Sequence, residues 1–66
     1  MNHLIKVKWL KGSFENSNFR KKLKNLCRLS QRENVVIIKP TSGNFYKCES
    51  IINEAVSSGF ANRVSG

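Results

Sequence analysis

Four consecutive β-branched residues, Val35 to Ile38, stand immediately before Lys39 and Pro40. A short apolar run of this kind, closed by a proline, predicts a buried β-strand over residues 34–40. Residues 3–9 alternate instead, with apolar and aromatic side chains on one face and Lys6 and Lys8 on the other. Alternation in period two predicts a second strand, with one apolar and one basic face.

The length limits how stable such a chain can be. A chain of 66 residues buries only about 60% of its unfolded surface, so an independent fold is marginal. Hydrophobic residues nevertheless make up 39% of the chain and include six aromatic residues, too many for a disordered polycation. We therefore expect one folded domain over residues 1–66, which would gain stability as a homodimer or on a partner.

Residues 19–32, FRKKLKNLCRLSQR, fit two periodicities equally well. A helix would place on one stripe Phe19, Leu23, Leu26 and Cys27. A strand would place on one face Phe19, Leu23, Cys27 and Leu29. Because a segment this long and rich in Lys, Arg and Leu favours helix, a helix is predicted over residues 19–32.

The C-terminal half supplies the other elements. Residues 40–43 contain turn-forming residues, and residues 44–48 are predicted to pair back as a strand, although Phe45 and Cys48 also fit a longer helix. A helix is predicted from about Glu49, with Gly59 as its stop, followed by a short edge strand at residues 60–64. The order β-α-β-β-α-β predicts an α+β, ferredoxin-like domain: a four-stranded antiparallel sheet with two helices on one face.

The net charge of +8 comes from one half of the chain. Residues 1–32 contain nine Lys or Arg against one Glu, whereas residues 33–66 have no net charge. An unopposed excess attracts anionic partners: RNA or single-stranded nucleic acid, an acidic host protein, or, least favoured here, a membrane. The predicted helix presents six candidate binding residues, Arg20, Lys21, Lys22, Lys24, Arg28 and Arg32. No carboxylate within residues 19–32 offsets their repulsion.

Two aromatic residues join this candidate site. Aromatic rings on an open sheet face can stack unpaired bases, at about 1–3 kcal/mol per base. Trp9 on the first predicted strand, and Phe45 or Tyr46 on the third, are in position to do so. Trp9 and Tyr46 are therefore predicted binding residues, with core packing as the alternative for each.

Catalysis has little support in the sequence. His3 is the only histidine, the four glutamates are scattered and there is no aspartate, so no acid–base pair is indicated. Two cysteines without close ligand spacing do not indicate zinc, and no glycine-rich phosphate loop is present. We expect a non-enzymatic protein without cofactor or metal. With no leader and no apolar run of about 20 residues, we expect a cytoplasmic protein in which Cys27 and Cys48 are reduced core residues.

The N-terminal third resembles the Dmd-type antitoxins of T-even phages. The shared positions are Leu4, Ile5, Lys6, Val7, Trp9, Leu10, Ser17, Phe19, Lys21 and Leu23. Members of that family are small proteins that bind and inhibit host ribonuclease toxins. The resemblance therefore implies a phage protein that acts as a stoichiometric inhibitor of a host protein. A basic surface would speed the association, and an apolar anchor would prolong it.

Overall fold

The computed structural model describes residues 4–64, which form four strands, two α-helices and one 3-10 turn. In chain order these are β1 (Ile5–Trp9), η1 (Phe14–Asn16), α1 (Asn18–Leu23), β2 (Cys27–Arg32), β3 (Val35–Pro40), α2 (Phe45–Ser57) and β4 (Ala61–Arg63). The strands and α-helices thus follow the predicted order, although the elements between residues 19 and 48 begin and end at other residues than predicted.

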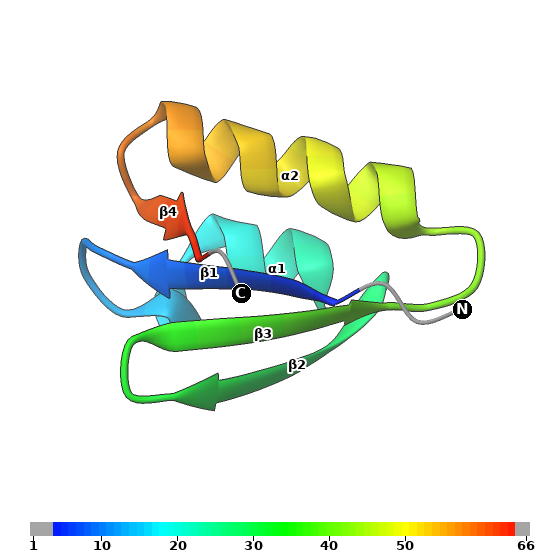
Figure 1. The fold of residues 1–66 in the computed structure, drawn as a ribbon, viewed down its shortest axis with the longest axis horizontal. Helices are drawn as coiled ribbons and strands as arrows, with labels where there is room; N and C mark the ends of the chain where they lie inside the picture. Colours follow the sequence, from blue (N-terminus) through cyan, green and yellow to red (C-terminus); the bar gives the residue numbers. More distant parts are fainter. Residues whose placement is uncertain (1–3, 65–66) are drawn as a thin grey trace.

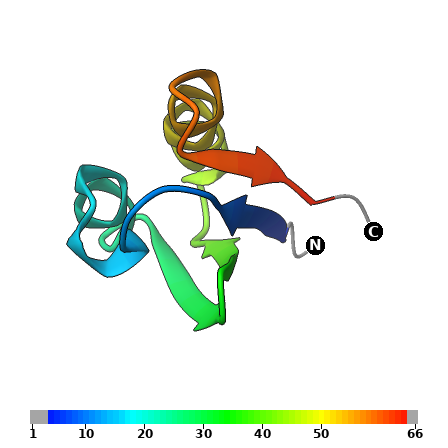
Figure 2. The same ribbon diagram turned by 90° about the vertical axis from the view of Figure 1, so that its left-hand side faces the viewer.

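The four strands form one antiparallel sheet in the order β2-β3-β1-β4. Helix α1 joins β1 to β2, and α2 joins β3 to β4, so each helix connects two strands that a third strand separates (Figure 1). Figure 2 shows both helices on the same side of the sheet. The predicted α+β class, with a four-stranded antiparallel sheet and two helices, is therefore confirmed.

One core lies between the sheet and the helices. The strands and α2 contribute most of its buried residues: Ile5, Val7, Trp9, Cys27, Val36, Ile38, Cys48, Ile52, Ala55 and Ala61. Phe14 of η1 and Leu23 of α1 complete it. Only every second residue of β3 is buried, because the helices cover one face of the sheet. The predicted strand at residues 34–40 is confirmed, but Val35 and Ile37 lie half-buried on the opposite face.

The helix predicted over residues 19–32 is wrong in its second half. Helix α1 ends at Leu23, a turn follows, and Cys27 begins β2. β2 pairs with β3 along its whole length, with Leu29 opposite Ile38. The strand pairing needed to extend the sheet outweighs the helix propensity of Lys and Arg, which is worth only tenths of a kcal/mol per residue.

The strand predicted at residues 44–48 is also wrong. The backbone turns at Gly43, whose φ is 83°, and α2 begins at Phe45. The helical spacing of Phe45 and Cys48 therefore prevails, and β2 takes the place of the predicted hairpin partner. Gly59 ends α2 as predicted: its φ is 82°, and its N–H donates to the Val56 carbonyl at 3.1 Å.

Candidate functional site

Neither helix covers the second face of the sheet within residues 4–64. Side chains alternate along a strand, so the neighbours of the core residues point to this uncovered face. They are Lys6, Lys8, Arg28, Ser30, Arg32, Val35, Ile37, Lys39 and Asn62. Five of these are basic, and we call them the basic sheet face: Lys6, Lys8, Arg28, Arg32 and Lys39.

The strand register arranges the basic sheet face in two rows. Lys6 and Lys8 lie on β1, opposite Ile37 and Val35 of β3. The second row, Arg28 and Arg32, lies on β2 on the other side of β3. Arg32 is opposite Val35, as Lys8 is from the β1 side. Neighbouring strands are about 4.8 Å apart, so the rows lie about 10 Å apart with β3 between them. Each row carries cations, and the strip between them is largely apolar.

In the part of the chain that the structure describes, the uncovered face carries no carboxylate among its basic residues. Glu49 and Glu54 lie on α2, Glu15 lies in η1 and Glu33 in the β2–β3 turn. Within residues 4–64, no side chain of the basic sheet face forms an ion pair. Moreover, Arg28 and Lys39 stand directly opposite each other on neighbouring strands, an arrangement that costs stability. A bound anion would remove that cost.

The structure divides the six basic candidate binding residues of residues 19–32 between two surfaces. Four of its six residues belong to α1 or its C-terminal cap: Arg20, Lys21, Lys22 and Lys24. Lys22 pairs with Glu54 at 3.7 Å and has its Nζ 5.9 Å from the centroid of the Phe19 ring. The other two, Arg28 and Arg32, lie on the uncovered sheet face.

Lys6, Lys8 and Lys39 are the members of the basic sheet face that the sequence prediction missed. The alternation of residues 3–9 already placed Lys6 and Lys8 on one face. What the sequence did not show is that Arg28 and Arg32 join them there, because this depends on residues 27–32 being a strand.

The two predicted aromatic binding residues lie in different surroundings. Trp9 is only 6% exposed and packs edge-on against Phe14, with ring centroids 5.0 Å apart. It therefore packs in the core, the alternative stated above, and its ring is not available for stacking on a base. Tyr46 is 84% exposed, but it lies on α2 and not on the sheet. Within residues 4–64, no aromatic residue belongs to the uncovered sheet face.

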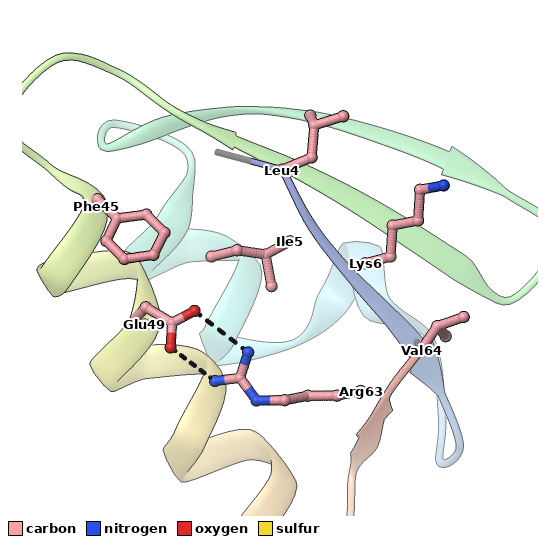
Figure 3. Close-up of a pocket in the computed structure, with 7 residues that line it drawn as sticks. All are labelled: Leu4, Ile5, Lys6, Phe45, Glu49, Arg63 and Val64. Atoms are coloured by element: carbon pink, nitrogen blue, oxygen red, sulfur yellow. Dashed lines mark hydrogen bonds and ion pairs between the residues drawn. The ribbon is translucent and has the colours of Figure 1, made fainter. Parts of the chain in front are cut away.

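A hollow of about 340 Å³ lies where β1, β4 and the first turns of α2 meet (Figure 3). Its lining residues are Leu4, Ile5, Lys6, Phe45, Glu49, Arg63 and Val64. The Arg63 guanidinium donates to both carboxylate oxygens of Glu49, at 3.2 and 3.0 Å, and to Asn53 Oδ1 at 2.6 Å. Because these bonds hold the guanidinium, Arg63 acts here as a tie between β4 and α2.

Cys27 and Cys48 are free thiols in the core. Burial, and next the neighbouring Cys48, raise the pKa of the Cys27 thiol from 9.0 to about 12. Burial also raises the pKa of Cys48. The Cys27 thiol donates to the Leu23 carbonyl at 3.0 Å. Thiols held neutral in this way are poor nucleophiles, and both residues fit the predicted role of core packing.

We also searched residues 4–64 for metal-ligand clusters and for membrane-spanning helices. No group of three or more His, Cys, Asp or Glu side chains gathers there as metal ligands would. No helix in this range has the length and apolar character needed to cross a bilayer. In the comparisons with known proteins, no family model, no curated protein and no solved structure matches the chain.

Proposed function

We propose that this chain is a non-enzymatic nucleic-acid-binding protein that holds the phosphate backbone on its basic sheet face. One observation carries the proposal: five cations share one uncovered sheet face, and no carboxylate lies among them. Lys and Arg side chains supply the phosphate contacts that dominate nucleic-acid affinity. Phosphates would also neutralise the opposed pair Arg28 and Lys39.

The composition of the face favours phosphate over a protein surface. Protein interfaces are depleted of Lys and enriched in aromatic residues at their centres. The basic sheet face carries three Lys and two Arg, and β3, which lies between the two rows, contributes to this face the aliphatic residues Val35 and Ile37 and the cation Lys39. Lysine is a compact point charge suited to phosphate, and arginine adds a forked donor.

We infer further that the domain is ferredoxin-like, as the sequence predicts. The support is that each helix connects two strands lying on either side of a third, as in the split βαβ arrangement. In that arrangement the helices occupy one face and leave the other for ligands. The fold supplies the platform, and the function rests on the charges.

A titration of labelled RNA and DNA, followed by fluorescence anisotropy, tests the proposal. Replacing one residue of each row, Lys8→Gln with Arg28→Gln, should weaken binding about 10²-fold at 50 mM salt, because two phosphate contacts are lost. The matched control, Lys11→Gln with Lys47→Gln, removes the same charge from exposed positions off the face. It should change the affinity by less than about tenfold, since only long-range attraction is lost.

Two results would contradict the proposal. One is wild-type protein that binds neither RNA nor DNA at 50 mM salt. The other is a larger loss from Lys21→Gln with Lys24→Gln than from the sheet-face variant, which would move the binding surface to α1. Circular dichroism of each variant establishes that its fold is retained.

A second candidate function, inhibition of a host protein such as a ribonuclease toxin, has support from a different surface. Tyr46, Leu4 and Val64 are 84%, 49% and 41% exposed, and the latter two line the hollow at the start of α2. Tyrosine is among the residues that most often anchor protein interfaces, and apolar neighbours around such an anchor help to exclude water. Of the antitoxin-like positions, Val7 and Leu23 are buried in the core, whereas Leu4 and Leu10 are exposed.

This candidate is tested by capture from a nuclease-treated bacterial lysate. An inhibitor that uses this surface should retain a host protein, lose it on Tyr46→Ala, and keep it when Lys8→Gln and Arg28→Gln are combined. A captured protein that is lost from the sheet-face variant and kept by Tyr46→Ala would refute the anchoring role of Tyr46.

A further inference from the structure

The uncovered sheet face has a geometry that narrows the class of nucleic acid, if the proposed function holds. Its cations are not spread evenly: Lys6 and Lys8 form the β1 row, while Arg28 and Arg32 form the β2 row. The rows are two strand spacings apart, about 10 Å; within them, Lys6 and Lys8 are about 7 Å apart, and Arg28 and Arg32, four residues apart, are about 13 Å apart. Lys39, on β3, lies directly opposite Arg28 and supports the second row.

The strip between the rows offers little to an unpaired base. Proteins that hold single strands rely on aromatic rings on which successive bases stack. Trp9 is in the core, and the other aromatic residues lie on η1, α1, α2 or at Phe60, before β4. Between the rows, β3 presents Val35 and Ile37, whose side chains carry no hydrogen-bonding groups, and the cation Lys39.

The face has few uncharged polar groups that recognise base edges. Sequence is read by hydrogen bonds from side chains such as Asn, Gln or Arg in a groove. Ser30 and Asn62 are the only uncharged polar side chains on this face within residues 4–64, and both lie on edge strands. Arg28 and Arg32 can contact guanine in a major groove, but the minor groove offers only a degenerate pattern of base edges, so across it their contacts would go mainly to phosphate, which fixes position and carries no sequence information.

A double helix presents two phosphate strands on either side of a groove. The minor groove is about 6 Å wide in B-form DNA, and it is wider and shallower in A-form RNA, where proteins recognise it by shape. Two rows of cations about 10 Å apart, carried on long flexible side chains that can lean inward or outward, can each contact one of two such strands. We propose that the basic sheet face binds duplex nucleic acid across a groove, one row on each phosphate strand, without reading sequence.

The test compares a duplex of about 16 base pairs with one of its single strands, at equal salt, by fluorescence anisotropy. With up to five phosphate contacts, the duplex affinity should fall about 10²–10³-fold between 50 and 200 mM salt. An A·T-rich and a G·C-rich duplex should agree within about threefold, since each base-specific contact would add roughly 1–3 kcal/mol of discrimination. RNA and DNA duplexes form separate arms that identify which helix form fits better.

Variants of the two rows separate this geometry from simple charge density. Lys6→Gln with Lys8→Gln removes the β1 row, and Arg28→Gln with Arg32→Gln removes the β2 row. Either change should reduce the preference for duplex over single strand to within about threefold, because one remaining row meets only one strand. The control, Lys11→Gln with Lys47→Gln, should keep the wild-type preference.

Each outcome bears on one proposal. Single strand bound as tightly as duplex by the wild type would overturn the two-row inference while leaving nucleic-acid binding intact. A duplex preference that survives in both row variants would overturn it as well, because charge density alone would then explain the preference. Binding of neither form at 50 mM salt would instead remove the proposed function.

Amide chemical shifts of the wild-type protein, measured during titration with the duplex, do not depend on any variant folding. We expect the largest changes at Lys6, Lys8, Arg28 and Arg32. Changes confined to α1 or α2 would contradict the inference.

Discussion

At the scale of single residues, the two cysteines show how the core determines side-chain chemistry. Cys27 begins β2 and Cys48 lies on α2, so both thiols occupy the space between sheet and helix. Their pKa values are raised chiefly by burial, which disfavours the thiolate. The same residues in an exposed, basic setting would have lowered pKa values and high reactivity.

The prediction at this scale concerns thiol reactivity. Because the pKa of Cys27 is about 12, almost none of its thiolate forms at pH 8, and the same direction of shift holds for Cys48. Iodoacetamide should therefore alkylate both residues much more slowly in the folded protein than in 8 M urea, with rates followed by mass spectrometry. Equal rates in the two conditions would show that the thiols are accessible and ionised.

The raised pKa of Cys27 also predicts that the free energy of unfolding falls at alkaline pH. Between pH 9 and 12 the unfolded chain loses the Cys27 proton while the folded chain keeps it. The folded state then binds more protons, so the stability supplied by the neutral thiol is present below pH 9 and is lost as the pH rises through this window. Cys27→Ala should show a smaller fall in stability over the same range.

At the scale of elements, residues 19–32 explain how far the sequence could predict the fold. The alternation around Val7 and the β-branched run at residues 35–38 identified β1 and β3, because strong local patterns agreed with the tertiary structure. Residues 27–32 did not have such a pattern, since Cys27 served either period equally. Their strand state depends on pairing with β3, a contact that local propensity does not contain.

The sequence identified some residues of the candidate site but not the face that they share. Arg28 and Arg32 were predicted as site residues from charge, whereas alternation placed Lys6 and Lys8 on one face without assigning them to the site; their shared face with the two arginines required the strand order. Trp9 was ambiguous because large aromatic residues serve both cores and binding surfaces. The alternation of residues 3–9 placed it on the apolar face, but the rings that pack on it, Phe14, Phe19 and Phe60, are brought together only by the tertiary structure.

The prediction at this scale concerns the opposed pair on β2 and β3. Lys39→Glu converts the repulsion with Arg28 into attraction, which should stabilise the fold by roughly 0.2–1 kcal/mol in urea unfolding. The same change should weaken nucleic-acid binding, because it places a carboxylate on the phosphate-binding face. Lys11→Glu makes the same charge change off the sheet. It should raise stability less and weaken nucleic-acid binding less than Lys39→Glu does. A less stable Lys39→Glu protein that binds normally would refute both expectations.

At the scale of the whole molecule, charge is distributed by face. The charged residues of the uncovered sheet face are all cations, whereas α2 carries Glu49 and Glu54 in ion pairs with Arg63 and Lys22. Such an asymmetry orients the protein so that its basic face approaches an anionic partner, which speeds association. The cost is internal repulsion in a domain of 66 residues whose stability is marginal.

That cost predicts how stability responds to salt. The screening length falls from about 10 Å at 0.1 M to about 3 Å at 1 M, so the repulsion between rows about 10 Å apart should disappear at high salt. The free energy of unfolding in urea should therefore rise between 0.1 and 1 M NaCl. The combined Lys8→Gln and Arg28→Gln variant should rise less than the control that combines Lys11→Gln and Lys47→Gln. Both variants have the same net charge, so any general effect of salt on hydrophobic burial cancels between them. An equal rise in the two variants would mean that the face carries no unusual repulsion, and the argument that it requires an anion would then fail.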